Sequence, residues 1–139
     1  MAAFTDKAEI REIFAELGRR AATSEAAKAL FEAGMVVAFV YSSPDLTLLM
    51  DGRTPEEGGP AMIMRLDETE PQPDVTFSCS ADLGHRFWSG ELDVTQALAR
   101  GEITARGSIA KALRLLPLMP PLYEEYRRLR AERVAGAPA

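Results

Sequence analysis

The sequence predicts an α+β fold in which a single β-sheet carries helices on one of its faces. Stretches with the two-residue alternation of strands follow one another between residues 35 and 80. Stretches with helical spacing precede them, follow them and flank one more strand-like segment around Ala105. A sheet covered by helices on one face accommodates this order, and 139 residues suffice for a single domain over residues 1–139.

Two helices are expected in the N-terminal segment, residues 1–34. Residues 6–17 place apolar side chains at helical spacing, and Gly18 is expected to end this helix. A second helix is expected to begin after Ser24, whose hydroxyl suits an N-cap, and to end at Gly34.

A core of sheet and helices is expected over residues 35–119. Its first four strands are predicted at residues 35–42, 46–52, 61–67 and 74–80. The last of these shows the clearest alternation, with Val75, Phe77 and Cys79 on one face. The first is apolar on both faces, which suits a central strand.

The second half of the core predicts two short helices, a strand over residues 102–107 and a further helix that Ser108 can cap. The strand has a glycine at each end, Gly101 and Gly107, and we expect these glycines to let it pass tightly between helices. Prolines then interrupt the chain, and a last amphipathic helix with a tail is expected within residues 120–139.

Composition excludes several classes of function. A net charge of −5 argues against nucleic acid as a partner, because phosphate binding requires a basic surface. No apolar stretch reaches the length of a transmembrane segment, and the charged N-terminus does not resemble a signal peptide. A single cysteine excludes an internal disulfide, and we expect a cytoplasmic location.

No arrangement of catalytic residues is visible, so an enzyme, a metal site and a cofactor are not expected. His85 is the only histidine, and no G-x-S-x-G motif accompanies it. Cys79 lies on an apolar strand face, where a buried and unreactive thiol is the usual outcome. One cysteine and one histidine cannot form a zinc site of three or four such ligands.

The segment from Pro73 to Leu116 resembles the sterol carrier protein 2 family, the sterol-transfer domain. Five short motifs match in order and spacing: Asp74-Val75-Thr76, Ser89-Gly90-Glu91-Leu92, Ala97-Leu98, the glycine-bounded strand from Gly101 to Gly107, and Ser108 at a helix start. Residues 35–68 fit the first three strands of the family in length and order. The chain departs from the family in its two N-terminal helices and in its proline-interrupted C-terminal end.

The resemblance implies a five-stranded, mostly antiparallel sheet with helices on one face and an apolar tunnel between them. In the family this tunnel takes fatty acids, acyl-CoA, sterols or phospholipids, usually without catalysis. The resemblance and the lack of a fused enzyme favour a stand-alone carrier of bacterial type.

Alternation and resemblance together predict the residues that line the tunnel. The predicted lining consists of apolar side chains from strands and helices: Leu48, Met50, Met62, Met64, Phe77, Phe87, Trp88, Ile103, Leu113, Leu116 and Met119. Three cations, Arg106, Lys111 and Arg114, are candidates at the mouth for a carboxylate or phosphate headgroup. Solvated faces of a strand and a helix are the simpler interpretation of these cations.

The expected function is therefore the non-enzymatic binding and transfer of a hydrophobic lipid. The main alternative is an accessory or dimerisation module for a lipid- or isoprenoid-metabolising enzyme, with a collapsed cavity. In that alternative the C-terminal helix docks on an enzyme or on a second copy of the chain. Transient contact with a membrane surface remains open in both cases.

Overall fold

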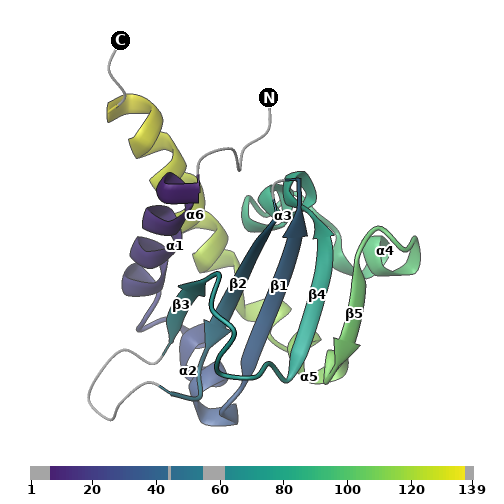
Figure 1. Ribbon diagram of the computed structural model, residues 1–139. Helices are drawn as coiled ribbons and strands as arrows, with labels where there is room; N and C mark the ends of the chain where they lie inside the picture. The colour runs from purple at the N-terminus through teal and green to yellow at the C-terminus, as the bar shows by residue number, and fades with distance from the viewer. Residues whose placement is uncertain (1–6, 44, 55–61, 137–139) are drawn as a thin grey trace.

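The computed structural model describes residues 7–43, 45–54 and 62–136, with the backbone alone at 134–136. Its five strands form one mixed sheet in the order β3-β2-β1-β4-β5 (Figure 1). The strands are β1 (Val36–Ser42), β2 (Leu46–Asp51), β3 (Ile63–Leu66), β4 (Val75–Ser80) and β5 (Thr104–Gly107). Only β1 and β4 pair in parallel, so the prediction of a mostly antiparallel α+β sheet is confirmed.

The helices cover one face of the sheet (Figure 1). They are α1 (Lys7–Arg20), α2 (Glu25–Ala33), α3 (Ala81–Trp88), α4 (Val94–Ala99), α5 (Ile109–Leu113), the 3₁₀ helix η1 (Leu116–Leu118) and α6 (Pro120–Gly136). In the described ranges, no helix combines the length and the apolar character needed to span a membrane.

The first helix continues past Gly18 to Arg20, so the prediction that Gly18 ends it is wrong. Gly18 instead allows α1 to approach β3 closely. A Cβ atom at Gly18 would lie 3.1 Å from Cγ of Met64, which is tighter than ordinary side-chain contacts. The glycine is therefore explained by packing between a helix and the edge of the sheet.

The second helix has both of its predicted ends. The Ser24 hydroxyl accepts a hydrogen bond from the backbone N–H of Ala27 at 3.2 Å. Gly34 follows the helix in the left-handed conformation, with φ of 60°. These two ends deliver the chain directly into the central strand β1.

The parallel pair of β1 and β4 forms the centre of the sheet. Its register places Phe39 beside Phe77 and Tyr41 beside Cys79. Because side chains alternate along a strand, these residues share the face that the helices cover. The larger side chains of β1 therefore point toward the helices, and smaller ones such as Ala38 point to the opposite face.

The strand β5 lies at the free edge of the sheet, paired only with β4. The strand does not pass between helices, so the prediction that its glycines allow such a passage is wrong. Gly107 has φ of +95°, and a Cβ atom there would lie 2.2 Å from the backbone oxygen of Asp74, on the neighbouring chain segment. Gly101 has φ of +75° with open space around it. Ser108 precedes α5 as predicted, but its hydroxyl makes no capping hydrogen bond.

A crossover segment, residues 67–74, covers part of the opposite face of the sheet (Figure 1). It carries the chain from β3 at one edge past β2 and β1 to the start of β4. Beneath it Val36, Ala38 and Leu49 form a small, separate apolar cluster. The main core lies on the helical side.

The last helix, α6, packs against α1 and α3 and completes the main core. Its apolar stripe consists of Leu122, Tyr126 and Leu129, which are all buried. Pro120 and Pro121 begin this helix, because the first turn of a helix tolerates proline. The stripe is therefore occupied within the chain and is not a free surface.

Candidate functional site

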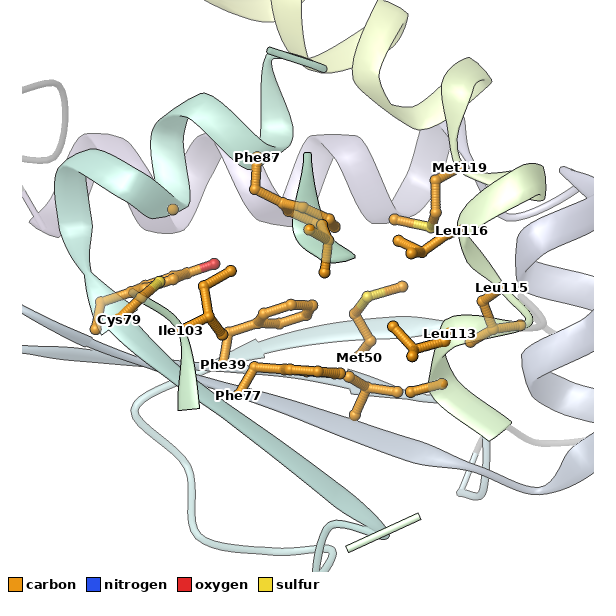
Figure 2. Close-up of a pocket in the computed structure, with 15 residues that line it drawn as sticks. Phe39, Met50, Phe77, Cys79, Phe87, Ile103, Leu113, Leu115, Leu116 and Met119 are labelled. Atoms are coloured by element: carbon orange, nitrogen blue, oxygen red, sulfur yellow. The ribbon is translucent and has the colours of Figure 1, made fainter. Parts of the chain in front are cut away.

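An apolar cavity lies between the helical face of the sheet and the helices α3, α4 and α5, with η1 at one end (Figure 2). Its volume is about 50 Å³. It is lined by Val37, Phe39, Tyr41, Met50, Phe77, Cys79, Gly84, Phe87, Val94, Ile103, Ala112, Leu113, Leu115, Leu116 and Met119. Pockets that hold drug-sized ligands have volumes of about 300–1,000 Å³, so this cavity is small.

Aromatic rings form much of the sheet side and the roof of the cavity. Phe39 stacks on Phe77 with ring centroids 5.9 Å apart, and Phe87 from α3 tilts onto Phe39 at 5.6 Å. Figure 2 shows these three rings around the same space, with Met50 beside them. Gly84 allows α3 to approach this close, since a Cβ atom there would lie 2.5 Å from the Tyr41 ring.

One wall of the cavity is less covered than the rest. Most lining side chains are buried; besides Cys79 on β4, the half-buried ones are Leu113, Leu115 and Leu116. These three residues follow one another from the end of α5 into η1 (Figure 2). The α5–η1 segment, residues 109–118, is therefore the wall that separates the cavity from solvent.

The polar side-chain groups that line the cavity include the Tyr41 hydroxyl and the Cys79 thiol. The Trp88 Nε1–H donates a hydrogen bond to the Tyr41 hydroxyl at 3.0 Å. Burial raises the pKa of the Cys79 thiol to about 11, so this thiol stays protonated and unreactive at neutral pH.

His85 lies on α3 and contacts α6. Its Nδ1 is 2.8 Å from the hydroxyl of Tyr126. Burial, followed by the positive charge of Arg130, lowers the pKa of His85. Among the residues that the structure describes, no group of three or more His, Cys, Asp and Glu side chains is placed to hold a metal ion.

The structure gathers most of the predicted lining residues around this cavity and places the others elsewhere in the core. Seven line the cavity: Met50, Phe77, Phe87, Ile103, Leu113, Leu116 and Met119. Four do not: Leu48, Met62, Met64 and Trp88. Met64 lies under α1, against Gly18, because α1 covers the β3 side of the sheet. Trp88 packs edge-on against Phe87, one layer behind the cavity.

Sequence reasoning missed the part of the lining that comes from β1. Val37, Phe39 and Tyr41 alternate with Ala38 and Val40 along that strand. The larger average size of the first set was the available signal. The space between the sheet and the helices holds the main core and is filled by the larger side chains. Gly84 and Leu115 gave no comparable signal, because their positions depend on how helices approach the sheet.

The three predicted mouth cations do not form one group. Lys111 lies on α5 and Arg114 follows the end of α5 directly; both are exposed. Arg106 is also exposed, but it pairs with Thr76 across the sheet and so points to the face opposite the cavity. Only Lys111 and Arg114 therefore lie on the wall that separates the cavity from solvent.

Comparisons with known proteins identify the fold. No family model matches the chain, and no curated protein matches it. The sterol carrier protein domain 2 of Helicoverpa armigera superimposes with a TM-score of 0.61 and 18% identity, covering 84% of this chain and 89% of that chain. A conserved hypothetical protein of Thermus thermophilus gives a TM-score of 0.58 and 19% identity, covering 93% and 91%.

The ubiquinone synthesis protein UbiJ-SCP2 also matches, with a TM-score of 0.56 and 16% identity over 86% of this chain and 89% of that chain. At these identities the similarity concerns the fold. The chain has the sterol carrier protein 2 fold that its motifs predicted.

Proposed function

We propose that this chain binds and transfers a hydrophobic lipid, whose acyl or sterol body enters the cavity between sheet and helices. One observation carries the proposal: in a sterol carrier protein 2 fold, an apolar cavity is lined from both the sheet and the helices. The lining has no set of polar groups that would suit a reaction, which favours a carrier without catalysis.

The physical basis is the burial of apolar surface. Each methylene removed from water contributes about 0.8 kcal/mol, so a long acyl chain offers on the order of 10 kcal/mol. Association and ordering oppose this with several kcal/mol. Micromolar affinity therefore follows without a strong polar contact, and one cavity can accept fatty acids, acyl-CoA, sterols or phospholipids.

A lipid requires the cavity to widen from its volume of about 50 Å³. The α5–η1 segment is the part best placed to move. It is short, its leucines are half-buried, and the Ser108 hydroxyl does not cap its helix. Outward movement of this wall enlarges the cavity and leaves the sheet and α3 in place. Lys111 and Arg114 would then lie close to the headgroup.

Binding of a fluorescent fatty acid to the purified chain tests the proposal, together with native mass spectrometry for a lipid that co-purifies. Leu113→Trp fills the space behind the α5 wall and should weaken binding about tenfold or more, because a fully buried side chain displaces several methylenes. Leu98→Trp is the matched control, since Leu98 is a half-buried leucine on α4 outside the lining. Equal affinities of both variants and the unaltered chain, or no binding at all, would contradict the proposal.

The second candidate function is an accessory module for an enzyme of lipid or isoprenoid metabolism. The match to a ubiquinone synthesis protein and the small cavity volume favour it. In this candidate the cavity stays closed and the chain acts through its surface. Sedimentation velocity of the purified chain addresses it: a stable dimer that binds no fatty acid favours this candidate over the carrier.

A further inference from the structure

The segment around the cavity wall has an unusual charge pattern. No Asp or Glu occurs from Ile103 to Tyr123, although the chain contains 21 acidic residues. The stretch does contain Arg106, Lys111 and Arg114, within a protein of net charge −5. The rest of the chain therefore carries a more negative net charge than the whole chain does.

The cations on the wall itself, Lys111 and Arg114, are free to meet an outside partner. Both are exposed, and neither makes an ion pair with any residue in the described ranges. They lie three positions apart on the chain, and residues at that spacing in a helix are neighbours on one face.

Apolar side chains on the same segment lie half out of the protein. The segment carries five that are partly buried against the core and partly exposed: Ile109, Leu113, Leu115, Leu116 and Leu118. Three of them also line the cavity. One continuous segment therefore presents aliphatic side chains and unpaired cations to solvent directly over the cavity.

We infer that the α5–η1 segment docks the protein on an anionic lipid bilayer. A short helix with aliphatic side chains and cations suits the interface between headgroups and acyl chains. Each cation near an anionic surface increases affinity about fivefold. The acidic remainder of the chain is repelled by the same surface, so the charge pattern turns this segment toward the lipid. A bilayer also offers the aliphatic side chains an apolar phase, which a small acidic ligand does not.

The inference goes beyond the proposed function, because docking does not require a lipid in the cavity. Co-sedimentation with vesicles tests it without any added ligand. We expect the purified chain to bind vesicles of equal parts phosphatidylcholine and phosphatidylserine, and to bind pure phosphatidylcholine vesicles about tenfold or more weakly. Binding should also fall as salt rises from about 0.1 M to about 1 M, because the Debye length shrinks from ~10 Å to ~3 Å.

A matched pair of double variants locates the docking surface. Lys111→Glu with Arg114→Glu should reduce binding to the anionic vesicles about twentyfold or more. Lys28→Glu with Arg86→Glu makes the same change in net charge at two exposed cations on α2 and α3, neither of which makes an ion pair in the described part of the chain. This control should keep most of the binding.

Leu118→Gln tests the apolar component, since Leu118 lies outside the cavity lining.

Several outcomes would overturn the inference. Equal binding to both kinds of vesicle would do so, as would equal losses in the two double variants. A change of oligomeric state in the Lys111/Arg114 variant, with no vesicle binding by the unaltered chain, would assign the segment to a protein partner instead. Failure of the proposed function is seen separately, in fatty-acid binding by the unaltered chain without vesicles.

Discussion

Asp51 is a fully buried carboxylate at the end of β2. Its partners lie on the neighbouring strand β3 and in the residues that follow β2. Its oxygens accept hydrogen bonds from Arg65 Nε at 2.9 Å and from the backbone N–H groups of Arg53 at 2.8 Å and Thr54 at 3.0 Å. The Thr54 hydroxyl also donates to it. Burial alone would raise the pKa of Asp51, but these hydrogen bonds together lower it below 3.8.

This cluster predicts a pH dependence of stability. Because the pKa of Asp51 is lower in the folded state, its contribution is complete above the unfolded value of 3.8 and is lost as pH falls through the folded value. Asp51→Asn should lower the free energy of unfolding at neutral pH by about 2 kcal/mol. It should also reduce the loss of stability on acidification, measured by urea unfolding over a pH series.

The exposed carboxylate Asp45, for which the structure gives no hydrogen bond, provides the control. Asp45→Asn should follow the pH profile of the unaltered chain closely. An Asp51→Asn profile parallel to that of the unaltered chain would contradict the assigned role of the buried carboxylate.

At the scale of elements, the two glycines that flank β5 are conformationally alike and sterically different. Both have positive φ, but only Gly107 faces a backbone atom, the Asp74 oxygen, at a distance that no Cβ atom could keep. Gly101→Ala should therefore cost only the strain of the left-handed conformation, about 1 kcal/mol. Gly107→Ala adds a backbone clash and should cost ~3 kcal/mol or more, because β4 or β5 has to shift.

Thermal and urea unfolding of the two single variants measure this difference. Equal destabilisation would show that the edge strand adapts and that the close approach to Asp74 is not a constraint. Loss of β5 pairing without a change in the rest of the sheet would appear as faster hydrogen exchange of the β4–β5 amides alone.

The same elements show what the sequence could and could not predict. Alternation correctly placed Val75 and Phe77 on the buried face of β4, because period-two patterning is a local property of the chain. It could not say which helix covers which part of that face. Met62 and Met64 were therefore assigned to the cavity, whereas the structure places α1 over β3 and the cavity over the other side of the sheet.

Gly18 illustrates the same limit in a helix. A glycine after an amphipathic stretch is a common end signal, but tertiary contact overrides it where a helix must lie close to a strand. The distance to Met64 that explains Gly18 exists only in the folded chain.

At the scale of the whole molecule, α1 and α6 hold each other in place although they are far apart in the sequence. Phe14 packs against Tyr126 with ring centroids 5.8 Å apart. Around this contact Arg20 pairs with Glu125 and Glu132, and Arg133 pairs with Glu12. The aromatic contact is buried and the ion pairs are largely exposed, so the apolar part carries most of the stability.

Removal of residues 121–139 should consequently abolish cooperative unfolding, because it uncovers Phe14 and Trp88 in the main core. Near-ultraviolet circular dichroism and a thermal melt measure this loss. Arg20→Gln removes ion pairs but leaves the apolar contact, and should cost at most about 1 kcal/mol. A truncated chain with an intact cooperative melt would show that α6 is dispensable for the core.

The pairing of α1 with α6 also affects how the chain folds while it is being synthesised on the ribosome. Pro120 follows Arg20 by 100 positions, and at about 5–20 residues per second the synthesis of this stretch takes on the order of 5–20 s. During that interval the part of α1 that packs against α6 has no permanent partner. Native packing is completed only after α6 has been synthesised, so a product that stops before α6 exposes an apolar helix face that chaperones and proteases can recognise.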